Sequence, residues 1–183
     1  AGVSLGHVSN VRTGLIDREW AHASDDGLVL SDPNALLDAW RDSYSAPLGE
    51  RLRFYTPLHG SALETAARSA LRSDSGPGHA AFASFSAAQW ISPYARTGMH
   101  YFFADEEGVR KLQAALKLTP SSKGDNVVIT VPKDLGLPVD TVEPAPGAAC
   151  TSPVQTYLDL FVAGERGAEA ADHLRQERLS WPK

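Results

Sequence analysis

The stretch TSPVQTYLDLF, residues 151–161, has the strongest local pattern in the sequence and decides how the fold ends. Ser152 fits a helix N-cap, Pro153 fits the first helical position, and Gln155 fits the N3 position of a capping box. Apolar residues then recur at helical spacing and predict a buried face. That face comprises Val154, Tyr157, Leu158, Phe161 and Val162. The polar residues of the stretch therefore have local structural roles and need no ligand.

The same helical spacing predicts that Thr156 and Asp159 point away from the buried face. Gly164 fits the C′ position that ends the helix. A second helix should follow, and small residues along one side of it would let the two helices approach closely. The residues on that side are Ala168, Ala171 and Leu174. The chain is thus predicted to end in two packed helices.

The composition is that of an ordinary globular protein. The chain has 183 residues, of which 43% are hydrophobic, enough for one medium domain or for a small module and a domain. Cys150 is the only cysteine, so no disulfide can form within the chain, which suits a reducing compartment. No apolar run approaches the roughly 18 residues of a membrane helix, and no signal peptide is visible. We therefore expect a cytoplasmic protein with no membrane partner.

The charge is negative and unevenly distributed. The net charge is −5, and residues 1–45 hold three arginines against seven acidic residues. Residues 46–183 are close to neutral. Neither part has the basic excess of a typical nucleic-acid-binding module.

The first part of the chain reads as a helix, a hairpin and a second helix. Ser4 can cap a helix that runs to about Glu19. Its apolar stripe comprises Leu5, Val8, Val11 and Leu15. Asp26 and Gly27 lie between two short, partly apolar runs and indicate a hairpin. A further helix is predicted to start at Pro33, capped by Asp32.

A break rich in proline and glycine at residues 46–49 predicts a boundary between two domains, 1–45 and 46–183. Beyond the break, strand and helix patterns alternate. The run EEGVRKLQAAL at 106–116 is typical of a helix. The continuous apolar run NVVITVP at 126–132 is typical of a central strand.

A helix followed directly by an Asp-Gly hairpin is the order found in the second half of a winged helix-turn-helix. The predicted fold class is therefore α+β, with a partial winged helix-turn-helix (recognition helix plus wing) followed by a mixed α/β domain ending in two packed helices. Asn10 could make a bidentate contact to adenine, and Ser9 and Thr13 could bond to a base or a phosphate. The full set of candidate DNA-binding residues is His7, Ser9, Asn10, Arg12, Thr13 and Arg18. The alternative is an amphipathic helix and hairpin that bind no nucleic acid.

Signals of enzymatic chemistry are sparse. Glu169 and His173 have the spacing of two metal ligands on a helix, but a solvent-facing pair is favoured because no HExxH pattern or cysteine set accompanies them. Cys150 could be a nucleophile with His79 or His100 as its base, yet a lone cysteine is more often a buried hydrophobe. No Walker or G-x-S-x-G pattern is present. We therefore expect no catalytic residues, no metal and no cofactor.

The sequence also resembles a known family. The run TSPVQTYLDLFVAGERGAEAADHLR, residues 151–175, resembles the closing motif of AbiEi-type transcriptional regulators, S-P-x-Q-x-Y-x-D-L followed by G-x-x-x-E-A-A-x-x-L. The matching residues are Ser152, Pro153, Gln155, Tyr157, Asp159, Leu160, Gly164 or Gly167, Glu169, Ala170, Ala171 and Leu174. Residues 3–40 are similar to the recognition helix, wing and following helix of that family. Residues 86–105 and 124–134 look like its middle.

The resemblance implies an antitoxin of a type IV toxin–antitoxin system. Such a protein would join a DNA-binding winged helix to a larger α/β domain and repress its own operon, so its partner would be the double-stranded DNA of its own promoter. It would oppose a nucleotidyltransferase-like toxin without a stable toxin complex. In the family, two helices precede the recognition helix, and this sequence does not contain them.

Two rival hypotheses belong to other functional classes. The first is a protein-binding module in which the winged-helix remnant is non-functional. The second is a cryptic nuclease or nucleotidyltransferase-like enzyme in the α/β domain. Convergent acids such as Asp105, Glu106 or Asp134 would favour the enzyme.

Overall fold

The computed structural model describes residues 4–72, 78–94, 97–133 and 136–181. The fold is α+β and divides into two compact units. The smaller unit comprises residues 1–44 with 180–183, and the larger comprises 45–179. Each unit is built from elements that are nearly continuous in sequence.

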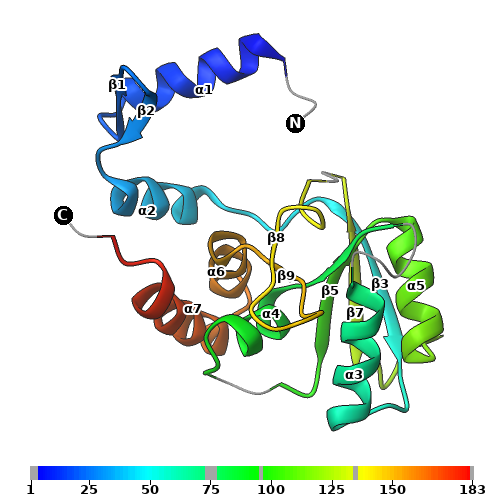
Figure 1. The fold of residues 1–183 in the computed structure, drawn as a ribbon. Coiled ribbons are helices and arrows are strands. Elements are labelled where there is room, and N and C mark those ends of the chain that lie inside the picture. The colour runs from blue at the N-terminus through cyan, green and yellow to red at the C-terminus, as the bar shows by residue number, and fades with distance from the viewer. Residues whose placement is uncertain (1–3, 73–77, 95–96, 134–135, 182–183) are drawn as a thin grey trace. The chain divides into compact units, whose positions relative to one another are not determined.

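The smaller unit contains a helix, a two-stranded hairpin and a second helix (Figure 1). In order these are α1 (Leu5–Asp17), β1 (Ala21–Ser24), β2 (Gly27–Leu30) and α2 (Pro33–Ser43). Both predicted helix caps are confirmed. Ser4 accepts a hydrogen bond from the backbone N–H of His7, and Asp32 accepts one from that of Ala35. These two caps set where the helices begin.

The predicted hairpin is also confirmed, but its turn lies one residue earlier than Asp26-Gly27. Ser24 pairs with Gly27, so Asp25 and Asp26 form the two-residue turn. Gly27 is the first residue of β2 and has a φ of +129°, a conformation that side-chain-bearing residues rarely adopt.

The larger unit is a seven-stranded mixed sheet with helices packed against it (Figure 1). The strand order is β6-β3-β7-β5-β4-β9-β8. The strands are β3 (Gly49–Tyr55), β4 (Ala80–Phe82), β5 (His100–Ala104), β6 (Thr119–Pro120), β7 (Val127–Pro132), β8 (Thr141–Val142) and β9 (Cys150–Thr151). The helices are α3 (Gly60–Leu71), α4 (Ser84–Ile91), α5 (Glu106–Leu116), α6 (Pro153–Phe161) and α7 (Glu165–Arg178).

The helices of the larger unit form two groups. α3 packs against α5, whereas α4, α6 and α7 pack against one another (Figure 1). Strand β7 lies between β3 and β5, and Val127, Val128 and Ile129 are at most 3% exposed. Its prediction as a central strand is confirmed. A strand buried on both faces must be covered from both sides, which a single group of helices cannot do.

Helix α6 begins as the sequence predicts. Ser152 accepts a hydrogen bond from the backbone N–H of Gln155 at 3.3 Å, and Pro153 is the first helical residue. The Gln155 side chain donates to Asp159 Oδ1 at 2.9 Å, and the Thr156 and Thr151 hydroxyls lie 2.8 Å apart. The capping prediction is therefore confirmed for Ser152.

The prediction of which α6 side chains are buried and which are exposed is partly wrong. Tyr157 and Leu158 are fully buried, as expected, but Phe161 is 38% exposed and Val162 is 44% exposed. Thr156 and Asp159, which were expected to point outward, are 0% and 8% exposed. The reason is that α6 contacts both α4 and α7, so more of its circumference is covered than one apolar stripe predicts.

Close packing of α6 on α7 depends on Gly167. A Cβ atom at this position would lie 2.2 Å from the backbone oxygen of Leu160. Gly164, expected at the C′ position of α6, is instead the N-cap of α7 and has a φ of +88°. The expectation that small residues let the last two helices approach closely is confirmed.

We predict that Gly167→Ala lowers stability, although alanine is the better helix former by about 1 kcal/mol. The added methyl group would collide with backbone, and such overpacking costs about 1–3 kcal/mol. Urea unfolding followed by circular dichroism would measure the change. Arg166→Ala, at the exposed neighbouring position, is the control and should shift stability by less than about 0.5 kcal/mol. A stabilised Gly167→Ala variant would contradict the packing described here.

Candidate nucleic-acid interface

Helix α1 presents three hydrogen-bonding side chains on one exposed face. Ser9, Asn10 and Thr13 are all exposed, and their spacing of three and four residues places them side by side along the helix. His7 and Arg12 are also exposed and flank this face on either side. The structure thus brings the candidate DNA-binding residues of α1 to one solvent-accessible surface.

Arg18 lies at the end of α1 and is held against its own helix. Its Nη1 atom donates to the backbone oxygen of Gly14 at 3.1 Å, and its guanidinium lies 5.4 Å from the ring centroid of Trp20. Arg12 forms no ion pair within the described part of the chain. Arg12 is therefore the cation of this helix that is more readily available to a phosphate.

Trp20 joins α1 to the hairpin, a role that the sequence analysis did not assign to it. Its backbone N–H donates to the oxygen of Leu15 at 3.0 Å, and its own backbone oxygen accepts from Ser31 N–H at 2.8 Å. The hairpin is further closed by a 2.9 Å hydrogen bond between His22 Nδ1 and Ser31 Oγ. Helix α1 and both ends of the hairpin are thus linked through one residue.

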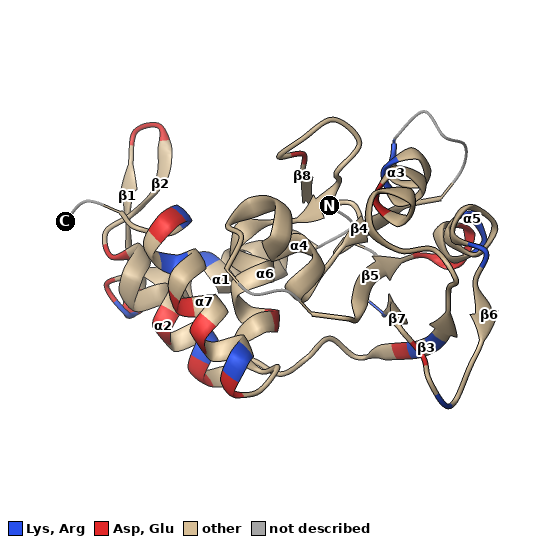
Figure 2. Cartoon of the chain, turned by 90° about the horizontal axis from the view of Figure 1, so that it is seen from below, with Lys and Arg blue, Asp and Glu red and all other residues tan. Residues whose placement is uncertain are grey.

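The acids of this unit lie on the polar face of α1, at the hairpin tip and on α2. Asp17 is exposed one turn after Thr13 on α1. Asp25 and Asp26 form the hairpin tip, which is red in Figure 2. On α2, Arg41 pairs with Asp38 at 3.1 Å and with Asp42 at 2.7 Å. The acidic hairpin tip would be repelled by phosphates, so any contact with DNA must be made by α1 or by the sides of the hairpin.

The apolar stripe of α1 is uncovered within the described residues. Leu5 is 88% exposed, Val8 is 50% exposed and Val11 is 49% exposed. On β2, Leu28, Val29 and Leu30 are between 38% and 47% exposed. A contiguous set of exposed apolar side chains commonly marks a surface that another segment or protein covers.

Two of the candidate catalytic residues in the larger unit, Cys150 and Asp105, have structural surroundings. Cys150 is fully buried, and this burial raises the pKa of its thiol to about 12. Asp105 caps α5, where its two carboxylate oxygens accept hydrogen bonds from the backbone N–H groups of Gly108 and His79. Asp134, another acid considered for an enzyme, lies outside the described residues.

The prediction that Glu169 and His173 on the last helix face solvent is confirmed for Glu169 only. Glu169 is exposed, and the ring of His173 lies 5.0 Å from that of Tyr94. In the parts of the chain that the structure describes, no three His, Cys, Asp or Glu side chains are grouped to hold a metal ion. No described helix is long and apolar enough to cross a membrane.

Comparison with known proteins identifies the family. A family model described as "Transcriptional regulator, AbiEi antitoxin, Type IV TA system" matches residues 28–180, most of the chain. The chain belongs to the AbiEi antitoxin family. The resemblance of the closing motif is thereby confirmed. No curated protein and no solved structure matches the chain.

The AbiEi match starts at Leu28, so it covers most of β2, all of α2 and the larger unit. Helix α1 and strand β1 precede it. AbiEi proteins are transcriptional regulators and antitoxins of type IV systems, a description with which DNA binding is consistent. The polar residues of the α6 motif hold that helix in place, because their side chains bond to one another and to the neighbouring backbone.

We predict that Cys150 is chemically inert in the folded AbiEi-family chain. Because its thiol is buried and has a raised pKa, iodoacetamide at pH 8 should modify it far more slowly in buffer than in urea, where the ordinary thiol pKa of about 8.5 returns. Mass spectrometry over a time course would measure both rates. Equal rates would indicate an accessible thiolate and revive the nucleophile hypothesis.

Proposed function

We propose that this AbiEi-family chain is a non-enzymatic, cytoplasmic DNA-binding regulator that represses its own operon, with α1 as recognition helix and β1–β2 as wing. The observation that carries the proposal is the exposed face of Ser9, Asn10 and Thr13, directly followed by a hairpin that Trp20 ties to the helix. The family supports it, because AbiEi proteins are transcriptional regulators.

In this proposal α1 enters the major groove, the groove wide enough to admit a helix. Asn10 is the candidate for a bidentate contact to adenine, and Ser9 and Thr13 bond to bases or phosphates nearby. His7 and Arg12 lie at the edges of the face and reach the phosphate backbone, as does Arg18 if it leaves Gly14. Base contacts by Asn10 supply the specificity, and the arginines set the register.

The acidic balance of the smaller unit shapes the affinity. Few cations are available to release counterions from DNA, so sequence-independent binding should be weak and its salt dependence shallow. The acids at the hairpin tip add repulsion wherever the fit to the operator is poor. Discrimination between operator and random DNA should then rest on a small number of base contacts.

We predict that Asn10→Ala weakens operator binding by about 1–3 kcal/mol and changes binding to random DNA little. Arg12→Ala should weaken both equally and reduce the salt slope by about one unit. Fluorescence anisotropy on the chain's own upstream DNA, at two salt concentrations, would measure these effects. Asn34→Ala, on α2 of the same unit, is the matched control and should bind the operator as the parent does.

Unchanged operator affinity in both Asn10→Ala and Thr13→Ala would show that α1 is not the reading element. The alternative function, docking of a protein on this unit, would then be favoured. It is motivated by the uncovered apolar stripe of α1, at Leu5, Val8 and Val11.

We also propose that the chain opposes its toxin without a stable complex. The two proteins, mixed at micromolar concentration, should therefore elute separately in size-exclusion chromatography. Co-elution would contradict this arrangement, and the result is independent of the DNA-binding test.

A further inference from the structure

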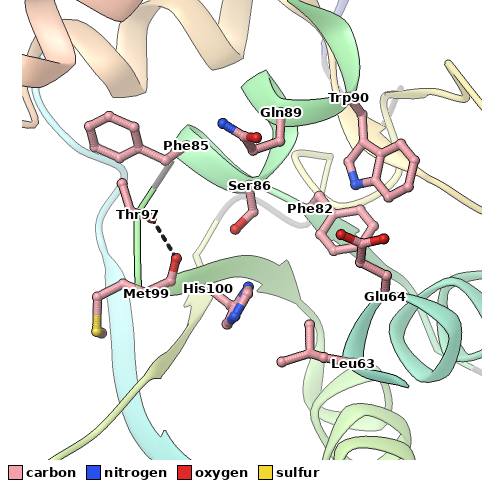
Figure 3. Close-up of a pocket in the computed structure, with 10 residues that line it drawn as sticks. All are labelled: Leu63, Glu64, Phe82, Phe85, Ser86, Gln89, Trp90, Thr97, Met99 and His100. Atoms are coloured by element: carbon pink, nitrogen blue, oxygen red, sulfur yellow. Dashed lines mark hydrogen bonds between the residues drawn. The ribbon is translucent and has the colours of Figure 1, made fainter. Parts of the chain in front are cut away.

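A cavity of about 340 Å³ opens in the larger unit (Figure 3). Its walls come from α3, from α4, from the end of β4 and from the start of β5 with the segment before it. The lining residues include Glu64, Phe82, Ser86, Trp90 and His100. The volume falls within the range of small-molecule sites, roughly 300–1,000 Å³.

One side of the cavity is an aromatic wall. Phe82 is 3% exposed, and its ring centroid lies 5.9 Å from that of Trp90 and 5.1 Å from that of Phe102. Figure 3 shows Phe82, Trp90 and Glu64 gathered on one side, with Ser86 and His100 between them and the opposite wall. Because Phe82 ends a strand that pairs with β5, the sheet holds this wall in place.

Trp90 already acts as an acceptor for a cation. The guanidinium of Arg68 lies 5.6 Å from its ring centroid, while Arg68 Nε donates to the backbone oxygen of Pro146 at 2.8 Å. Arg68 is thus directed toward Pro146, although it lies only one turn along α3 from Glu64. Within the described residues the Glu64 carboxylate has no ion-pair partner and is exposed to solvent.

Among the described residues that line the cavity, none is a lysine or an arginine. Burial lowers the pKa of His100 below the ordinary value of imidazole, and the Glu64 carboxylate partly opposes that shift. His100 is therefore neutral at pH 7. The cavity combines a carboxylate, electron-rich ring faces, a neutral imidazole and the Ser86 hydroxyl, which already accepts a hydrogen bond from the N–H of Tyr101.

We propose that this cavity binds a small organic cation, an ammonium or guanidinium group carried on an aromatic or alkyl body. Glu64 pairs with the cationic group, Trp90 and Phe82 contact the body and the adjacent charge, and His100 offers a neutral hydrogen-bonding group. An anion of the same shape is disfavoured, because it would meet the Glu64 carboxylate, while the nearby Arg68 guanidinium is already engaged by the Trp90 ring and the backbone oxygen of Pro146. The site is independent of the proposed DNA interface.

Isothermal titration calorimetry of the full chain at pH 7.5 tests the proposal with matched probes. Tryptamine and agmatine carry the cation on an aromatic and an alkyl body, and indole-3-propionate carries an anion on the aromatic one. At least one of the two amines should bind at a single site, and indole-3-propionate should not. Binding of neither amine at millimolar concentration would overturn the proposal, as would equal binding of tryptamine and indole-3-propionate.

Substitutions at Glu64 and Trp90 locate the bound cation. Glu64→Gln keeps the shape of an exposed side chain and should weaken amine binding roughly tenfold, because the charge-assisted contact is lost. Glu169→Gln, which removes an exposed carboxylate from α7, should bind the amine as the parent does. Trp90→Phe should retain part of the affinity that Trp90→Ala loses. Undiminished binding by Glu64→Gln would overturn the assignment.

Discussion

Strand β7 is bonded to a neighbour along both edges and buried on both faces, and the larger unit depends on that position. β3 pairs with it in the antiparallel sense and β5 in the parallel sense. Three consecutive residues, Val127, Val128 and Ile129, are buried, so both faces of this part of the strand must be covered by other parts of the chain. The register that aligns His100 with Val127 also determines where β5 begins, and thereby one wall of the cavity.

The two units use their polar residues differently. In the larger unit the polar side chains of the α6 motif are buried or partly buried and bonded within the protein, so the most patterned part of the sequence maintains the fold. In the smaller unit the polar face of α1 is exposed. Three acids of that unit have structural roles: Asp32 caps a helix, and Asp38 and Asp42 pair with Arg41. Asp17 on α1 and the acids of the hairpin tip remain exposed, so part of the negative charge lies on the surface that would meet DNA.

Helical periodicity mispredicts which side chains are buried where a helix packs against more than one neighbour. Periodicity identifies one buried stripe, and for α6 it correctly included Tyr157 and Leu158. It could not foresee that α4 covers a second side, which buries Asp159, or that Phe161 lies at the rim of the interface. The turn residues likewise predicted the hairpin but not the exact position of its turn. Asp26-Gly27 signalled a hairpin, whereas strand pairing placed the turn one residue earlier.

The sequence by itself determined the helix caps, the hairpin and the central strand, because each depends on residues within a few positions of one another. It also determined the family, through motifs spread along residues 28–180. Ser4, Asp32 and Ser152 each bond to a backbone N–H three residues away, so the local sequence contains both partners. Only the tertiary structure decided that Glu64 and His100 would line one cavity. They come from a helix and a strand that are distant in sequence, and the sheet register that brings them together is a long-range property without a local signal.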